Sequence, residues 1–341
     1  MSAPAVEGLD LAALDRFLSE RVPGYAGGLR AELVSGGRSN LTFRLTDGTS
    51  TWILRRPPLG TLTPSAHDMV REYRVVAALH GTAVPVARPV AVGDDGVFGV
   101  PFAVVENVPG SVLRSEDDLA ALSDADVHRC AFALVDTLAA LHAVDPAEVG
   151  LADFGRPEGY LRRQVRRWYG QWERVRTRDL PDVETLHARL DAGCPAESGA
   201  AVVHGDFRVD NAILDPDDPA RIRAVVDWEM ATLGDPLADL AVHLAYGDPA
   251  FAHVLGGSAA STSPRMPSAD ELAQRYAGAA GRDLSHLEFH LALAYFKIAV
   301  IAEGIHQRHL RGDTRGDGFG SVGAATGPLA AAGLHALGGA R

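Results

Sequence analysis

The chain has 341 residues, of which 47% are hydrophobic and 22% charged, an ordinary composition for a globular protein with one large or two smaller domains. Its 44 acidic residues outnumber its 32 basic ones, giving a formal net charge of −12. This charge argues against nucleic acid as a partner, because a phosphate backbone is bound by positive surface, and it favours a site that requires a cation.

The sequence also indicates a cellular location. The two cysteines, Cys130 and Cys194, are too few for a disulfide framework and lack the spacing of a metal site. The N-terminal segment is acidic early and has no basic stretch followed by an apolar core, so we expect no signal peptide. The longest apolar run, LALAYFKIAVIA, has about twelve residues, whereas a membrane span takes about 20. These features predict a cytoplasmic protein without a membrane partner.

The first third of the chain is rich in strand signals. After an opening helix, LTFRL alternates apolar with polar residues, and STWILRRPP follows across the turn TDGT, which predicts a β-hairpin. A helical pattern comes next, with Met69, Tyr73, Val76 and Leu79 on one face and a terminal glycine. Two further apolar runs complete this strand-rich part.

From about residue 117 the apolar spacing becomes helical, and helical patterns dominate the rest of the chain. They are interrupted by the short apolar runs AAVVHGDF, NAILD and IRAVVDWE. The predicted fold class is therefore α+β, with a small sheet and one main helix followed by a larger, mostly helical part. We place the joint at ENVPG, so that residues 1–106 form one domain and residues 107–341 the other.

Three polar side chains accompany the short apolar runs. Asp206 follows the first run, Asn211 lies five residues later, and Asp227 ends the third run. A carboxylate beside buried strands is costly without a partner, which favours a functional site over a solvated turn. Amide and carboxylate oxygens suit a hard cation such as Mg²⁺. Asn211 and Asp227 are therefore candidate metal ligands, and Asp206 is free to orient an attacking hydroxyl group or accept its proton.

Arg208, two residues after Asp206, is placed to meet the charge of a transferred phosphoryl group. The five-residue spacing from Asp206 to Asn211 is that of the kinase catalytic loop H-R-D-x-x-x-x-N, which a metal-binding aspartate follows. Asp239 is expected to act as a structural acceptor behind this loop.

The segments HGDFRVDN and DWEMATLGDPLADLA resemble the aminoglycoside and choline kinase-like phosphotransferase family, and the likeness extends over nearly the whole chain. The resemblance implies a two-lobed, protein-kinase-like fold with a small antiparallel sheet in the N-terminal lobe. It also implies transfer of phosphate from ATP, with Mg²⁺, to a small hydroxylated acceptor. The segments that are similar, more narrowly, to the phosphotransferase domains fused to some acyl-CoA dehydrogenases are SGGRSNLTFRL, WILRRPP, REYRVVAALHGTAVPVARPV, RRQVRRWYGQW and GIHQRHLRG.

In this family the first hairpin lies over the nucleotide triphosphate. The segment VSGGRSNLTF places Gly36, Gly37, Ser39 and Asn40 there, where small residues let backbone N–H groups approach phosphate. The segment lacks the G-x-G-x-x-G spacing, so an ordinary glycine-rich turn remains the alternative.

Arg55 stands where the family usually has a lysine that holds phosphates. A planar guanidinium does not replace an ammonium without rearrangement, although the charge is retained. Glu72 is the candidate partner of Arg55, and a solvated helix glutamate is the alternative. The resemblance further implies that backbone groups of Glu106 and Val108 contact adenine, although a plain linker fits the same sequence. Lys297, in an apolar helix, is interpreted as structural.

One segment bears on the acceptor. Arg156–Arg178 holds eight arginines against two acidic residues, and such a helix would repel a polycationic aminoglycoside and favour a phosphorylated or CoA-linked acceptor. The alternative is an amphipathic helix that buries Leu161, Val165, Trp168 and Trp172 and turns its arginines to solvent. The resemblance favours a hydroxyacyl-CoA as the first candidate acceptor.

The leading hypothesis is an ATP- and Mg²⁺-dependent phosphotransferase acting on a small hydroxylated metabolite. One alternative is a nucleotide-binding pseudokinase that serves as a scaffold, motivated by Arg55, and the intact set of Asp206, Asn211 and Asp227 argues against it. A second alternative is an antibiotic phosphotransferase with an aminoglycoside or macrolide as acceptor.

Overall fold

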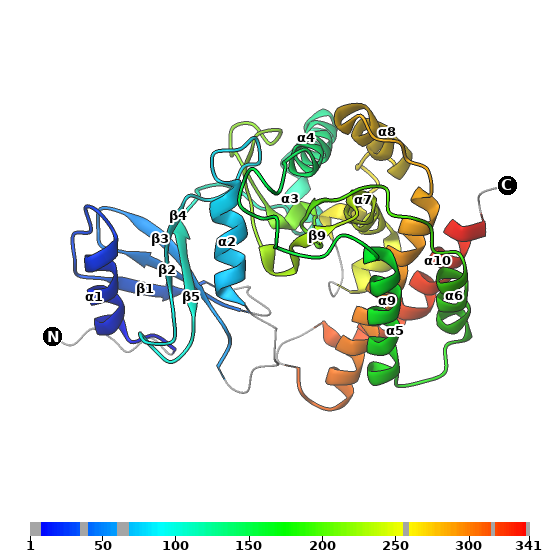
Figure 1. The fold of residues 1–341 in the computed structure, drawn as a ribbon, viewed down its shortest axis with the longest axis horizontal. Coiled ribbons are helices and arrows are strands. Elements are labelled where there is room, and N and C mark those ends of the chain that lie inside the picture. Colours follow the sequence, from blue (N-terminus) through cyan, green and yellow to red (C-terminus); the bar gives the residue numbers. More distant parts are fainter. Residues whose placement is uncertain (1–7, 35–39, 60–67, 255–258, 315–317, 339–341) are drawn as a thin grey trace. The chain divides into compact units, whose positions relative to one another are not determined.

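The computed structural model describes residues 8–34, 40–59, 68–254, 259–314 and 318–338 (Figure 1). The chain forms two compact units, of which unit 1 comprises residues 1–110 and 223–231 and unit 2 comprises residues 111–222 and 232–341. The short segment 223–231 thus belongs to unit 1, whereas the sequence groups it with residues 107–341. The functional division of the chain at residue 106 stays a prediction.

Unit 1 is built on a five-stranded antiparallel sheet. Its strands are β1 (Arg30–Leu33), β2 (Leu41–Thr46), β3 (Thr51–Arg56), β4 (Pro89–Gly93) and β5 (Phe102–Glu106), in the order β1-β2-β3-β5-β4 (Figure 1). The predicted hairpin is β2 and β3, which pair with Leu45 opposite Trp52. Asp47 closes its turn, because its carboxylate accepts the backbone N–H groups of Thr49 and Ser50.

The alternation of side chains along β3 separates the two faces of this sheet. Trp52 and Leu54 are buried on one face with Phe17 of helix α1 (Leu11–Arg21). Arg55 therefore projects from the opposite face, where helix α2 (Met69–Leu79) supplies its partner, Glu72.

Helix α2 buries a face that differs in part from the predicted one. Met69, Val76 and Leu79 are buried as expected, but Tyr73 is only partly buried and Glu72 is buried in full. A pattern of apolar residues cannot predict that a glutamate is buried. Glu72 is buried at a tolerable cost because the guanidinium of Arg55 neutralises its charge.

Unit 2 is mostly helical, as the sequence predicts. Its core joins α7, α9 and α10, with Ala241 and Val242 packed against Ala294, Ile298 and Leu329. Its helices are α3 (Glu116–Leu119), α4 (Asp124–His142), α5 (Tyr160–Val175), α6 (Pro181–Ala192), α7 (Pro236–Ala245), α8 (Ala269–Ala280), α9 (Leu287–Leu310) and α10 (Thr326–Gly338).

Short strands frame the segments that carry the candidate chemistry. β6 (Ala201–Val203) pairs antiparallel with β9 (Thr232–Gly234) in unit 2. β7 (Ala212–Leu214) also lies in unit 2, and β8 (Ile222–Val225) leads the chain into unit 1.

Helix α9 has 24 residues, twice the length of the apolar run seen in the sequence. In the described ranges it is the helix that is long and apolar enough to cross a membrane, but most of it is buried inside unit 2. Burial of this kind is typical of the core helix of a globular unit.

Helix α5 has the predicted amphipathic arrangement. Leu161, Val165, Trp168 and Trp172 are buried, and most of the arginines of the helix and its flanks are exposed. The use of these arginines as a ligand surface stays a prediction.

A glycine in the sheet of unit 1 allows a close aromatic contact. Gly93 lies opposite Phe102, and a Cβ on Gly93 would come within 2.1–2.9 Å of three atoms of that buried ring. We expect Gly93→Ala to lower the free energy of unfolding by about 1–3 kcal/mol, measured by urea denaturation. The control is Gly278→Ala in α8, where a Cβ meets nothing within 4 Å and helix propensity gains up to about 1 kcal/mol. Equal effects of the two substitutions would contradict this packing.

Candidate active site

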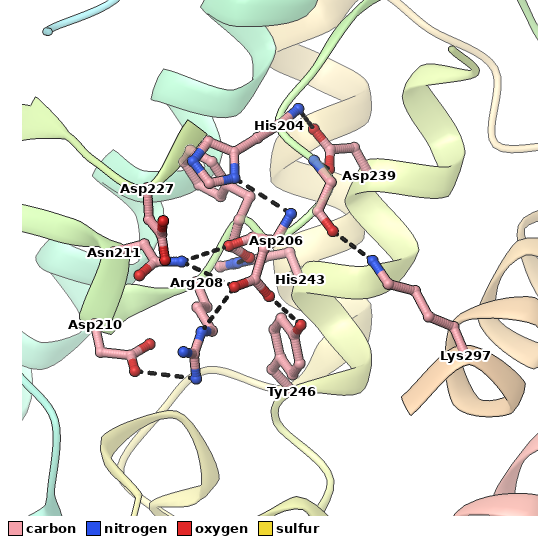
Figure 2. A network of polar contacts seen from close by, with 12 residues as sticks. His204, Asp206, Arg208, Asp210, Asn211, Asp227, Asp239, His243, Tyr246 and Lys297 are labelled. Atoms are coloured by element: carbon pink, nitrogen blue, oxygen red, sulfur yellow. Dashed lines mark hydrogen bonds and ion pairs between the residues drawn. The ribbon is translucent and has the colours of Figure 1, made fainter. Parts of the chain in front are cut away.

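The segment HGDFRVDN forms a loop in unit 2 between β6 and β7 and ends in the 3₁₀ turn Val209–Asn211 (Figure 2). All three residues of β6 are buried, so the loop starts from the core of the unit. Gly205 has φ +81°, a conformation that glycine adopts without strain, and it turns the chain so that Asp206 follows at the surface of the core.

Both carboxylate oxygens of Asp206 are held. Tyr246, at the end of α7, donates its hydroxyl to Oδ1. Asn211 donates Nδ2 to Oδ2 at 3.1 Å and to the main-chain carbonyl of Asp206 at 2.9 Å. The backbone N–H of Asp206 donates to Nδ1 of His204 at 3.2 Å. The side chain is nevertheless 20% exposed, so it remains accessible to a substrate.

Arg208 lies beside this carboxylate (Figure 2). Its Nε is 3.5 Å from Oδ2 of Asp206, and its Nη1 is 3.0 Å from Oδ2 of Asp210. Burial raises the pKa of Asp210, and the charge of Arg208 opposes this shift. The two carboxylates orient the guanidinium next to Asp206.

Asp239 of α7 is the structural acceptor that the sequence predicts. Its carboxylate accepts the backbone N–H groups of His204 at 2.7 Å and Gly205 at 2.8 Å. His142 of α4 lies 3.3 Å from the same carboxylate and 2.6 Å from the hydroxyl of Tyr276 in α8. Burial by itself raises the pKa of Asp239, but its interactions with the two histidines outweigh burial and hold that pKa below its usual value.

Sequence reasoning missed two residues of this site. No motif includes Tyr246, and nothing in its local pattern points to Asp206. Lys297 has a structural contact, as the sequence predicts, but the sequence does not show its partner: its Nζ donates to the carbonyl oxygen of Gly205 at 2.5 Å. A single buried lysine in an apolar helix was the signal that could have marked it, because an ammonium is rarely buried without a partner.

In unit 1, Arg55 joins two carboxylates. Its Nη1 lies 2.7 Å from Glu72, which confirms the predicted ion pair, and its Nη2 lies 2.8 Å from Oδ1 of Asp227. Burial raises the pKa of Glu72 to about 7, and Arg55 opposes that shift. Asp227 has φ +67°, an uncommon backbone conformation for a non-glycine residue, at the start of the turn Trp228–Met230.

The other predicted nucleotide contacts also belong to unit 1. Glu106 is exposed, its side chain is 2.8 Å from Arg88, and its backbone N–H donates to the carbonyl of Arg88. That N–H is therefore not available to a purine, while Val108, two residues on, is partly exposed.

The segment predicted to cover the phosphates is described only at its end. Gly36, Gly37 and Ser39 lie outside the described residues, so their role stays a prediction. Asn40 is buried, and its Nδ2 lies 3.2 Å from Glu229.

The two candidate metal ligands each keep an oxygen for a cation. Asn211 commits Nδ2 to Asp206, and in the described part of the chain its amide oxygen accepts no hydrogen bond. Asp227 gives one oxygen to Arg55 and keeps the other. An amide oxygen and a carboxylate oxygen are each ligands of the kind that a hard divalent cation takes. Asn211 belongs to unit 2 and Asp227 to unit 1.

Residues 30–282 match the model of the phosphotransferase enzyme family. The chain belongs to this family. It is 37% identical over 338 residues to acyl-CoA dehydrogenase family member 11 of Gallus gallus. The alignment covers 96% of this chain but 43% of that protein. The chain thus spans less than half the length of this curated relative.

Solved structures of phosphotransferases are also similar. A putative aminoglycoside phosphotransferase from Ralstonia eutropha is 32% identical, with a TM-score of 0.84 over 97% of this chain and 99% of that one. A thermostable aminoglycoside phosphotransferase in complex with AMP-PNP and hygromycin B has a TM-score of 0.63 at 16% identity, covering 96% and 99% of the two chains. The fold is therefore that of the protein-kinase-like aminoglycoside phosphotransferases, and the predicted class and family are confirmed. The family is one of phosphotransferase enzymes, the enzyme class that the sequence predicts.

The Arg55 ion pairs give a prediction about stability. Arg55→Met leaves Glu72 buried without its cation, so we expect the free energy of unfolding to fall by about 3–5 kcal/mol in urea denaturation. The double variant Arg55→Met/Glu72→Met removes both charges and should recover most of that loss. A double variant no more stable than Arg55→Met alone would show that the cost has another origin.

Proposed function

We propose that this phosphotransferase uses ATP and Mg²⁺ to transfer the γ-phosphate to a hydroxyl group of a small metabolite, with a hydroxyacyl-CoA as the first candidate acceptor. The observation that carries the proposal is the environment of Asp206. Its carboxylate is held by Asn211 and Tyr246, stands beside the cation of Arg208, and is partly exposed. A distant structural neighbour was solved with the ATP analogue AMP-PNP, which supports ATP as the phosphate donor.

In the proposed mechanism, Asp206 orients the acceptor hydroxyl and takes its proton as the phosphoryl group is transferred. Transfer of this kind proceeds through a loose transition state, so catalysis rests on positioning and charge neutralisation. Arg208 stands beside Asp206 and neutralises charge on the phosphoryl oxygens. Mg²⁺, held by Asn211 and Asp227, would offset the negative charge of the nucleotide phosphates.

The proposed nucleotide contacts come from unit 1. A guanidinium has five N–H donors, and the ion pairs of Arg55 engage two of its nitrogens, so further donors remain for the α- and β-phosphates. We further propose that the backbone carbonyl of Glu106, whose N–H is bonded to Arg88, and backbone groups of Val108 contact adenine. The residues proposed to cover the triphosphate are Gly36, Gly37, Ser39 and Asn40.

A pocket of about 400 Å³ within unit 2 is the proposed acceptor site. Arg208 and Tyr246 line it next to Asp206, and apolar side chains such as Leu134 and Met266 line its other walls. Among its described lining residues Asp248 is the one carboxylate, and it already caps a 3₁₀ turn through the N–H of residue 250. Such a pocket offers a polycation one lining carboxylate and favours a neutral or anionic acceptor with an apolar part.

Two further observations support an acyl thioester over an antibiotic. The curated relative is named as an acyl-CoA dehydrogenase family member, so acyl-CoA chemistry in a related polypeptide is consistent with a hydroxyacyl-CoA acceptor. The exposed arginines of Arg156–Arg178, which lie outside the lining of this pocket, favour an acceptor that carries phosphate beyond the part that the pocket holds. We place the reaction in the cytoplasm, because Cys130 and Cys194 are free thiols.

The competing function is a nucleotide-binding scaffold without turnover. Its motivation is Arg55 in place of the usual family lysine. The partners of Arg55 argue for an active enzyme. The guanidinium has the same charge as the missing lysine, and it pairs with both Glu72 and Asp227.

Loss of the Asp206 carboxylate tests the mechanism. We expect Asp206→Asn to lower kcat by about 10²–10⁴-fold, because general-base assistance is lost, while ATP binding persists. ADP release is measured with a panel of hydroxyacyl-CoAs, sugars and amino alcohols, and ATP affinity by calorimetry. Asp217→Asn, on an exposed turn of the same segment, is the matched control and should keep wild-type turnover.

Two outcomes would contradict different parts of this proposal. Full turnover by Asp206→Asn would remove Asp206 from the mechanism. A wild-type protein that binds ATP but releases no additional ADP with any acceptor would favour the scaffold.

Filling the pocket tests the acceptor site. Met266→Trp places a larger side chain in the pocket, so we expect at least a tenfold rise in the KM of the acceptor and little change in the KM of ATP. Leu310→Trp, at an exposed position of α9, is the control for adding a tryptophan. Equal acceptor KM values in wild type and Met266→Trp would place the acceptor elsewhere.

A further inference from the structure

Lys297 is the only lysine in the chain, and it lies buried in α9 at the catalytic loop (Figure 2). Its Nζ donates to the carbonyl oxygen of Gly205 at 2.5 Å and lies 5.8 Å from the centre of the Trp168 ring in α5. Burying an ammonium group is costly unless it is paired and hydrogen-bonded. The hydrogen bond of this buried ammonium is made to Gly205, the residue before Asp206.

Gly205 is held by charged side chains on both of its peptide groups. Its N–H, in the peptide that joins it to His204, donates to Oδ1 of Asp239 at 2.8 Å. Its carbonyl, in the peptide that joins it to Asp206, accepts from Lys297. The N–H of that second peptide donates to Nδ1 of His204. Both polar ends of the Gly205–Asp206 peptide are thus fixed, and with them the direction in which Asp206 leaves the loop.

The space beside the ammonium is too small for a substrate. A cavity of about 30 Å³ adjoins it, which is room for one or two water molecules. An ammonium has three donors, so such a water can satisfy those that Gly205 does not use. The side chains that line this cavity include Tyr160, Gln164, Trp168, Asp239, His290 and Lys297.

We propose that Lys297 is a positioning residue for phosphoryl transfer. Its ammonium group holds the Gly205–Asp206 peptide so that the carboxylate of Asp206 faces the acceptor hydroxyl. This inference rests on the proposed role of Asp206. It gives α9 an indirect part in catalysis, because Lys297 acts through the loop and does not touch the substrate.

The charges around the ammonium are consistent with this role. Burial lowers the pKa of Lys297, the carboxylates of Asp206 and Asp239 oppose that shift, and Arg167 of α5 adds to it. The two carboxylates favour the protonated form, which is the form that donates to Gly205. The titratable or charged groups that face the ammonium are Asp206 of the loop, Asp239 of α7, Arg167 and Tyr160 of α5, and His290 of α9.

Removing the ammonium while keeping its apolar stem tests the inference by kinetics. We expect Lys297→Met to lower kcat by about 10- to 100-fold, the loss expected for a hydrogen bond to a charged group, with the KM of ATP within about twofold of wild type. Thermal stability should change little, because loss of the hydrogen bond to Gly205 is offset by removal of a buried charge. The matched control is Glu303→Gln, which removes another buried charge of α9. The carboxylate of Glu303 accepts hydrogen bonds from Thr177 and Thr326, and its loss should leave kcat unchanged.

A second measurement needs no acceptor. Because the chain has one lysine, protein labelled with ¹⁵N at lysine Nζ gives a single lysine side-chain NMR signal. We expect Asp206→Asn to lower the pKa read from that signal, because a neighbouring negative charge is lost, and we expect Glu303→Gln to leave it unchanged.

The outcomes separate this inference from the proposed function. A lysine signal that does not respond to Asp206→Asn would overturn the inference, whatever the acceptor proves to be. Wild-type kcat in Lys297→Met, or a kcat that falls only as far as the folded fraction measured by circular dichroism, would overturn it as well. An acceptor panel without turnover would count against the proposed function, while the NMR result would still report the contact with the loop.

Discussion

The carboxylate of Asp239 accepts the two backbone N–H groups at the start of the candidate catalytic loop, residues 204–211, and the arrangement of the site in unit 2 depends on this contact. A loop that leaves a buried strand exposes N–H groups to a medium without water, and each must find an acceptor. One buried aspartate serves both His204 and Gly205. Because His142 supports that aspartate from α4 and Tyr276 supports the histidine from α8, three helices share in holding one loop. The loop is therefore positioned by contacts with the core of unit 2.

The rule that a buried polar group needs a partner also applies to Arg55 in unit 1. A lysine is a point charge, whereas the planar fork of Arg55 reaches Glu72 with one nitrogen and Asp227 with another. The buried glutamate requires a cation, and burial raises its pKa even in the presence of that cation. Replacement of lysine by arginine thus keeps the charge of the site and adds a direct contact to a candidate metal ligand. This is a physical reason to interpret the substitution as compatible with an active phosphotransferase.

The chain belongs to the phosphotransferase enzyme family, which supports phosphoryl transfer as the proposed reaction, and the surroundings of the loop bear on the proposed acceptor. The solved relatives of this fold include enzymes bound to aminoglycosides, which are polycations. The proposed acceptor pocket of this chain is largely apolar. The charged side chains that line it include Arg208, which lies beside Asp206. A fold can keep its phosphate chemistry while the acceptor changes, because the residues that line the pocket come from α4, α8 and the loops beside them and not from the catalytic loop alone.

The sequence by itself determined the features whose parts lie close together along the chain: the β2–β3 hairpin, the amphipathic α5, the Asp206 to Asn211 spacing, and the family. It also predicted the pair of Arg55 and Glu72, because a known motif links them. Only the tertiary structure decided that Tyr246 and Lys297, 40 and 91 residues after Asp206, act on the catalytic loop. The physical reason is that periodicity reports whether a side chain is buried, whereas the partner of a buried polar group is selected by how distant helices pack.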